Sequence, residues 1–232
     1  SFDVTTDGDW TYTLDNATAQ SLAGGEVVTE TFTVTATTAD GESIDQTVTV
    51  TVTGAEDAPV ISGATTGAVA EDGVLSAAGS LATDDADATD TPTFTAQNGT
   101  AGAYGSFDVT TDGNWTYTLD NAAAQSLAGG ETVTETFTVT ATTADGESVP
   151  QTVTVTVTGT EDAPVITGTA IGSVAEDGTL AATGTLATDD ADASDTPTFT
   201  PQTGTAGAYG SFDVTTDGDW TYTLDNATAQ SL

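Results

Sequence analysis

The sequence contains no lysine, arginine or histidine, so its 36 Asp and Glu residues give a formal charge of −36. Nucleic-acid binding depends on Lys and Arg side chains that displace counterions from phosphates, and anionic membrane surfaces attract the same residues. No apolar run approaches the ~18 residues of a membrane-spanning helix. We therefore expect no nucleic-acid partner and no membrane insertion in this segment.

Cysteine is absent too, so disulfides cannot hold the fold together, and zinc would lack its preferred Cys and His ligands. Catalysis would lack the usual His, Cys and Lys bases and nucleophiles. Paired carboxylates can hydrolyse glycosides, but here acidic pairs recur with a repeat, which favours a structural role. We do not expect an enzyme.

The charge of one sign carries an energetic cost. Two carboxylates about 4 Å apart repel each other by roughly 4 kcal/mol at an effective dielectric constant near 20. The sequence offers no cationic side chain, so only protons, salt or a bound metal can neutralise the closest groups. The alternative is a solvated acidic surface that only confers solubility.

A long internal repeat organises the chain. Residues 1–22 recur letter for letter at 211–232 and with two changes at 106–127, so the period is 105 residues, the size of a whole domain. The Glu-Asp-Ala-Pro segments at 56–59 and 161–164 are natural boundaries, because Pro interrupts strand pairing. We predict the C-terminal half of one repeat at 1–54, a complete repeat at 55–159 and the N-terminal part of a third at 160–232. Neighbours in the same chain or other copies in a fibre could complete the outer two.

Alternating apolar and Thr residues predict strands, with Trp115, Tyr117 and Phe137 facing inward. Asp108 and Glu135 are expected on the surface or at an edge. The segment 121–127 resembles a helix capped by Asp120 or Asn121. Seven strands in about 100 residues indicate an all-β fold of tandem immunoglobulin-like sandwiches. We place them at 59–69, 74–82, 92–98, 106–111, 115–119, 132–142 and 150–158.

Acidic residues gather in the connections at the two ends of this sandwich. Because successive strands alternate in direction, the leading end, where the linker joins, should hold Asp84, Asp85, Asp87, Asp90 and Asp145. The trailing end should hold Glu71, Asp72, Asp120 and Glu131. The linkers add Glu56, Asp57, Glu161 and Asp162, and the third repeat adds Glu176, Asp177, Asp189, Asp190, Asp192 and Asp195.

End-to-end stacking of two repeats would bring these groups together as oxygen ligands. Calcium accepts six to eight oxygens in tolerant geometry, whereas magnesium demands a stricter octahedron. We therefore expect Ca²⁺ at the junctions, bound by the acidic residues named above. For a single acid such as Asp112, an ordinary Asp-Gly turn is the simpler explanation.

The order of motifs resembles the VCBS repeat of large bacterial surface adhesins of the RTX type, a repeat similar to cadherin-like sandwiches. The motifs are Glu-Asp-Ala-Pro-Val-Ile, Ala-Glu-Asp-Gly, Thr-Asp-Asp-Ala-Asp-Ala, Tyr-Gly-Ser-Phe and Asp-Gly-Asn-Trp-Thr-Tyr-Thr-Leu-Asp-Asn. The resemblance implies junction calcium, extracellular localisation after type I secretion, and attachment or biofilm formation. It assigns ligand roles to Glu71, to Glu161 with Asp162, and to Asp190 with Asp192. The linker departs from the Asn-rich cadherin pattern.

Three functions remain open from the sequence. The first is a calcium-stiffened extender of a cell-surface adhesin. The second is a self-assembling filament whose chains complete one another by strand addition. The third is a lectin-like module, for which Tyr104 is the one plausible exposed aromatic.

Overall fold

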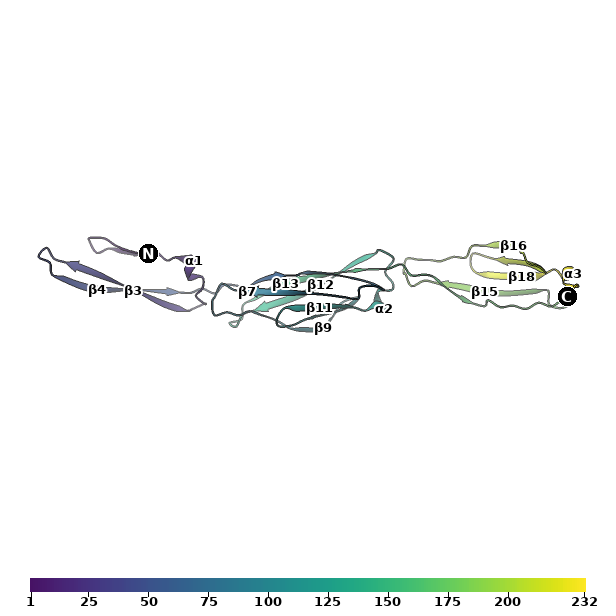
Figure 1. Cartoon of the computed structure of the whole chain (residues 1–232), viewed down its shortest axis with the longest axis horizontal. Helices are drawn as coiled ribbons and strands as arrows, with labels where there is room; N and C mark the ends of the chain where they lie inside the picture. The colour runs from purple at the N-terminus through teal and green to yellow at the C-terminus, as the bar shows by residue number, and fades with distance from the viewer.

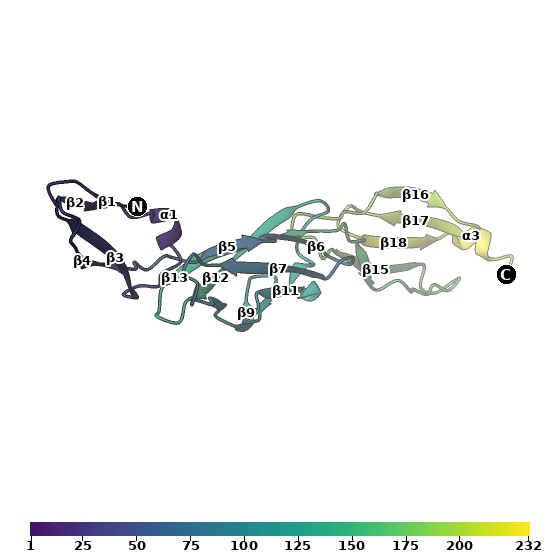
Figure 2. The same cartoon turned by 60° about the vertical axis from the view of Figure 1, so that its left-hand side comes forward.

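The computed structural model describes all 232 residues as three β-rich bodies in a row. Figures 1 and 2 both show an elongated molecule, with the N-terminal and C-terminal segments on opposite sides of a central sandwich. The three helices have four residues each, and no helix could cross a membrane.

The central sandwich consists of two sheets. Five strands lie in the order β5-β7-β11-β10-β9 and four in the order β6-β13-β12-β8, with β6 parallel to β13. The first sheet contains β5 (Val60–Gly63), β7 (Ser76–Asp84), β9 (Gln97–Ala101), β10 (Gly105–Val109) and β11 (Asn114–Leu119). The second contains β6 (Thr66–Ala70), β8 (Thr93–Phe94), β12 (Thr132–Thr142) and β13 (Ser148–Thr158). Helix α2 (Asn121–Ala124) connects β11 to β12.

The apolar positions of the alternating strands fill the space between these sheets. The Phe107 and Phe137 rings stack across the core with centroids 4.6 Å apart. Trp115 packs closely against Gly79, where a Cβ atom would come within 2.5 Å of the indole ring. The Trp115 indole N–H donates to the Ala64 carbonyl at 2.8 Å, so the largest core side chain has no unpaired polar atom.

The predicted strands agree with this arrangement, with differences at their ends. The strand expected at 59–69 divides into β5 and β6, which join different sheets, and that at 92–98 divides into β8 and β9. The helix is shorter than expected and is capped by Asp120, whose side chain accepts from the N–H groups of Ala122 and Ala123. Leu75 falls within the strand predicted at 74–82, but it precedes β7 in the structure and is 41% exposed.

The two outer segments contain fewer strands. The N-terminal segment has the hairpins β1 (Phe2–Val4) with β2 (Trp10–Tyr12) and β3 (Val27–Thr37) with β4 (Ser43–Thr53), joined by α1 (Asn16–Ala19). The C-terminal segment has the sheet β14-β15-β18-β17-β16, followed by α3 (Asn226–Ala229). Its strands are β14 (Val165–Gly168), β15 (Ala181–Asp189), β16 (Gln202–Ala206), β17 (Gly210–Val214) and β18 (Asp219–Leu224).

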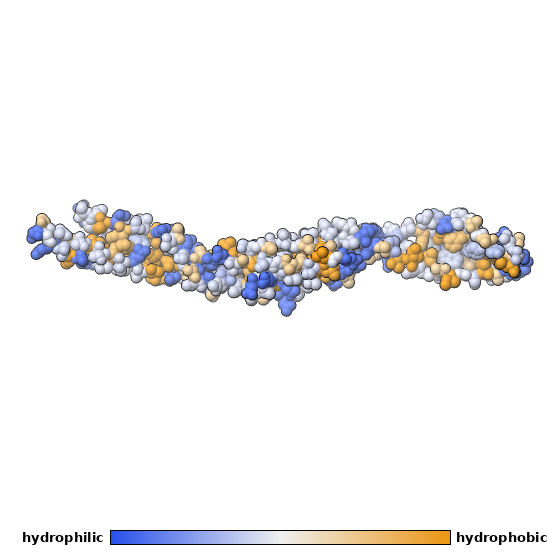
Figure 3. Space-filling view, in the orientation of Figure 1, coloured by the Kyte–Doolittle hydropathy of each residue, from blue (hydrophilic) through white to orange (hydrophobic).

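Apolar side chains are more exposed in the outer segments than in the centre. Trp10 is 49% exposed, whereas its repeat counterpart Trp115 is 1% exposed. Figure 3 shows apolar patches on both outer segments and strongly hydrophilic residues at the neck between the central sandwich and the C-terminal segment.

The expectation that Glu135 is an ordinary surface residue is wrong. Glu135 shares the inward parity of Phe137 on β12 and is 8% exposed. Its carboxylate accepts hydrogen bonds from the Tyr117 hydroxyl and from the backbone N–H groups of Ala103 and Tyr104. Burial is the main cause that raises the pKa of Tyr117, and the hydrogen bond and charge of Glu135 raise it further. The phenol therefore stays protonated and remains a donor. Glu135 thus ties β11, β12 and the β9–β10 turn together.

We predict that Glu135→Ala destabilises the central sandwich by about 3 kcal/mol, because the Tyr117 hydroxyl and two backbone N–H groups lose their shared acceptor. Urea unfolding followed by Trp115 fluorescence, with Trp10→Phe and Trp220→Phe in the background, measures this. The control Thr136→Ala, at the neighbouring outward position, should shift stability by less than about 0.5 kcal/mol. Equal effects of the two substitutions would contradict the structural role of Glu135.

Candidate metal sites at the junctions

The first junction lies between the N-terminal segment and the central sandwich. One carboxylate oxygen from each of Glu56, Asp87 and Asp90 lies within 4.8 Å of the others. Glu56 belongs to the linker after β4, and the two Asp residues belong to the β7–β8 loop. Asp145, in the β12–β13 turn, reaches the carboxylates of Glu56 and Asp90. Three separate stretches of chain thus converge on one point.

The loop conformation explains why the carboxylates point at one another. The Asp87 N–H donates to Asp85 Oδ1 at 3.0 Å, an Asx-type turn, and the Asp90 N–H donates to the Asp87 carbonyl at 3.0 Å. The Asp57 N–H donates to Asp87 Oδ2 at 2.9 Å, which fastens the linker to the loop. Asp87 is consequently only 2% exposed.

Several of these oxygens are buried and accept no hydrogen bond from an N–H or hydroxyl group. At the first junction they are Glu56 Oε1, Asp85 Oδ2, Asp87 Oδ1 and Asp90 Oδ2. A buried charged oxygen without a partner is costly, and in native proteins such a group usually meets an ion or water. The unpartnered oxygens therefore indicate a place for a cation.

The protonation of Glu56 reflects the same crowding. Hydrogen bonding to Asp145, burial and the negative charges of Asp145 and Asp90 raise the pKa of Glu56 to about 7. The pKa of Asp145 is lowered, mainly by its hydrogen bond with Glu56. Without a metal, a proton shared by this pair resides on Glu56 and offsets part of the repulsion.

The second junction, between the central sandwich and the C-terminal segment, repeats this arrangement. Oxygens of Glu161, Asp192 and Asp195 lie within 4.8 Å of one another. The Asp192 N–H donates to Asp190 Oδ1 at 3.0 Å, and the Asp162 N–H donates to Asp192 Oδ2 at 3.1 Å. Asp192 is 1% exposed, and its Oδ1 is buried without a partner, as is Asp162 Oδ2.

The β6–β7 turn adds Glu71 and Asp72 to the second junction. Burial raises the pKa of Glu71, and the charges of Asp162, Asp72 and Asp192 raise it further, against a lowering hydrogen bond from the Thr160 N–H. Burial and then the charge of Asp72 raise the pKa of Asp162. These carboxylates from the two bodies and the linker therefore repel one another across the junction.

Direct hydrogen bonds also join the bodies. The Ala88 N–H donates to the Ser21 carbonyl at 3.2 Å in the first junction, and the Ala193 N–H donates to the Ser126 carbonyl at 3.2 Å in the second. Both acceptors follow the short helices α1 and α2, at equivalent positions of the repeat. The loop that carries Asp87 at the first junction, or Asp192 at the second, therefore contacts the preceding body directly.

The structure brings together most, but not all, of the acids expected at the junctions. Converging side chains are Glu56, Asp85, Asp87, Asp90 and Asp145 at the first junction and Glu71, Asp72, Glu161, Asp162, Asp190, Asp192 and Asp195 at the second. Asp145 joins one set and Glu71 with Asp72 the other. The position 105 residues after Asp145 and the positions 105 residues before Glu71 and Asp72 lie outside the sequence.

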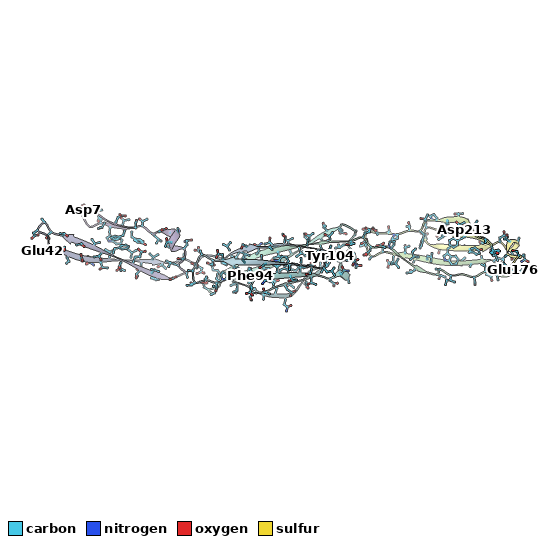
Figure 4. The ribbon with its side chains drawn as sticks, viewed as in Figure 1. Asp7, Glu42, Phe94, Tyr104, Glu176 and Asp213 are labelled. Carbon is cyan, nitrogen blue, oxygen red and sulfur yellow. The ribbon has the colours of Figure 1, made fainter.

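The side chains of the remaining predicted residues do not join these groups. Asp120 caps α2, and Glu131 accepts from the Ala128 N–H at 3.2 Å. Asp57 contacts the carboxylates of the first junction through its backbone N–H, which donates to Asp87 Oδ2. Asp84 and Asp189 end strands β7 and β15, where they pair with Val60 and Val165. Glu176 lies at the C-terminal tip of the molecule, far from both junctions (Figure 4), and the adjacent Asp177 bonds to Asn226 of α3.

Sequence reasoning missed the amide side chains of Asn121 and Gln125 beside the second junction. Both donate to acids of the β6–β7 turn. Their spacing of four residues around a helical turn is a signal that could have placed them on one face.

The arrangement suits calcium. Two oxygens bound to the same Ca²⁺ at about 2.4 Å can be at most about 4.8 Å apart. The three-carboxylate groups meet that limit at both junctions. The donors are all oxygens, from loops and linkers that can adjust, and calcium tolerates variable coordination more readily than magnesium.

Comparisons with known proteins agree with the fold. Residues 56–159 match the model of the family described as the bacterial cadherin-like domain. With the two-sheet topology, this match confirms the expected cadherin-like sandwich. No curated protein matches the chain.

Solved structures of cadherins resemble the chain at low identity. PcdhgB3 EC1-4 is 16% identical with a TM-score of 0.48, and the alignment covers 97% of this chain and 55% of that one. Drosophila N-cadherin EC1-4 is 13% identical with a TM-score of 0.38, covering 97% and 56%. Human Desmocollin-1 ectodomain is 18% identical with a TM-score of 0.34, covering 94% and 42%. The chain thus spans about half the length of these proteins.

The raised pKa of Glu56 predicts an unusual pH dependence without metal. A carboxyl whose pKa is higher in the folded state binds protons more tightly there, so its contribution to stability decreases as the pH rises through the interval from about 4.5 to about 7. In chelator, the melting temperature should therefore increase when the pH falls from about 8 to about 5. Glu56→Gln should reduce this dependence, whereas Glu42→Gln, in the distant β3–β4 turn (Figure 4), should not. Identical pH profiles for the wild type and Glu56→Gln would contradict the assignment.

Proposed function

We propose that this chain is a calcium-stiffened extender of an extracellular bacterial adhesin, a stalk that positions other domains for attachment or biofilm formation. The observation that carries the proposal is the unpartnered, buried Oδ1 atom of Asp87 and of Asp192, each inside a group of carboxylates. The chain has no cationic side chain to satisfy these atoms. A divalent ion would neutralise several acids at once.

A bound ion would join the central sandwich, the linker and the next body at the second junction, and it would hold the linker against the central sandwich at the first. At the second junction, Glu71 and Asp72 come from the central sandwich, Glu161 and Asp162 from the linker, and Asp190, Asp192 and Asp195 from the next body. At the first junction the ligands would be Glu56, Asp85, Asp87, Asp90 and Asp145. A complete junction between two whole repeats would combine both sets. Such a bridge restricts rotation about the linker.

The proposed repeat boundaries follow from the same junctions. The segments 1–54, 55–159 and 160–232 would be part, whole and part of successive repeats, each of which extends the stalk by roughly 40 Å. Their partners would be neighbouring repeats of the same chain, with no catalytic role. The resemblance to VCBS repeats supports secretion by a type I route. Calcium outside the cell would then favour the folded state, because it binds that state alone.

The lectin alternative has lost its support. Tyr104 packs against the core cluster, and its backbone N–H binds Glu135 at 2.9 Å. The residue therefore anchors the β9–β10 turn, and it does not form a free aromatic platform.

Calcium should stabilise and straighten the chain. At a concentration about 100 times the dissociation constant, binding adds about 2.7 kcal/mol per site, which corresponds to roughly 5–10 °C in melting temperature. Small-angle scattering should show a narrower distribution of lengths with calcium than with chelator. The proposal fails if the melting temperature and the scattering profile are the same in both conditions.

Asp192→Asn should remove the contribution of the second junction. The substitution keeps the shape of the side chain but removes its charge, so the calcium-dependent stabilisation should fall by about half while the first junction still binds. Calorimetric titration should show fewer bound ions. Asp112→Asn, in the β10–β11 turn away from both junctions, is the matched control and should bind calcium as the wild type does. Equal calcium binding in the two variants would contradict the role of Asp192.

A further inference from the structure

Helix α2 holds the acidic β6–β7 turn through two side-chain amides. The Asn121 Nδ2 donates to Asp72 Oδ1 at 2.7 Å, and the Asp72 N–H donates to Asn121 Oδ1 at 2.9 Å. Asp72 has φ of +51°, a left-handed conformation that a residue other than glycine adopts at a cost. The paired hydrogen bonds offset this cost and fix the turn in place.

Gln125 makes a different contact. Its Nε2 group donates to Glu71 Oε1 and, at 3.4 Å, to Asp72 Oδ1, so one amide nitrogen stands between two carboxylates. The other oxygen of Glu71 accepts from the Thr160 N–H at 3.1 Å. Glu71 is 1% exposed and is thereby partnered by neutral donors alone. The Gln125 nitrogen occupies a position suited to a cation.

The other helices provide two comparisons within the same chain. On α3, Asn226 holds Asp177 at 3.0 Å, Asp177 has φ of +52°, and Gln230 reaches Asp177 alone at 3.2 Å. Gln20, the equivalent residue after α1, makes no hydrogen bond to a carboxylate. Gln20 therefore donates to no carboxylate, Gln230 donates to one, and Gln125 donates to two.

We propose that Gln125 is an internal stand-in for the cation at the second junction. Its amide nitrogen holds Glu71 and Asp72 side by side when no metal is present, and the oxygen of the same amide is a ligand type that calcium accepts. Gln125 thus positions the pair in both states and sets how strongly the junction depends on calcium. This inference rests on the proposed function and specifies a residue that tunes it.

Two substitutions test this inference with opposite expected effects on calcium affinity. Gln125→Glu places a third carboxylate in the pair, so the melting temperature in chelator should fall, while the calcium dissociation constant of the second junction should tighten several-fold through the added charge. Gln125→Ala removes the donor without adding charge, so the melting temperature in chelator should fall and calcium binding should weaken about threefold. Calorimetric titration and melting in chelator are the two measurements.

The matched controls are Gln20→Glu and Gln230→Glu. In chelator, the loss of melting temperature should increase in the order Gln20→Glu, Gln230→Glu, Gln125→Glu. If Gln125→Glu and Gln125→Ala change calcium affinity in the same direction, or if Gln125→Glu behaves as Gln20→Glu does, Gln125 has only a packing role. A wild-type chain without any calcium response would overturn the proposed function instead. The order of the melting-temperature losses in chelator would still test whether Gln125 holds Glu71 and Asp72 together.

Discussion

Repulsion among carboxylates that have no cationic partner in the chain limits how its β-rich bodies can pack against one another. The outward faces of the sheets can leave their acids in water, where the charge is screened and solvated. The junctions cannot, because their acids converge and are partly buried between bodies. The central sandwich and the two outer segments therefore meet at regions of concentrated negative charge, which protonation of Glu56 can offset only in part.

The chain buries carboxylates in two different ways. Glu135 accepts hydrogen bonds from three donors and stabilises the architecture of one sandwich. Asp87 and Asp192 each accept linker N–H groups on one oxygen and leave the other without a partner. This contrast separates a structural acid from a candidate ligand without reference to sequence motifs.

Much of this architecture could be predicted from the sequence, because alternation with period two fixes which side chains face inward and strand order fixes which turns share an end. The same alternation places Glu135 inward, and the expectation of a surface or edge position did not follow that alternation. Asp120 and Glu131 show a second limit. Both belong to the correct end of the sandwich, yet a helix cap and a local turn use their oxygens. Gln125 depends on tertiary contact between α2 and the β6–β7 turn, which spacing along the chain does not reveal.

The most direct test is anomalous diffraction from crystals of the chain grown with calcium. If calcium bridges the junctions, an anomalous peak should lie at each of them, about 2.3–2.6 Å from Asp87 Oδ1 and from Asp192 Oδ1, with further carboxylate oxygens around it. Junction carboxylates that turn outward into water, with no peak between them and the bodies still aligned, would contradict a calcium bridge.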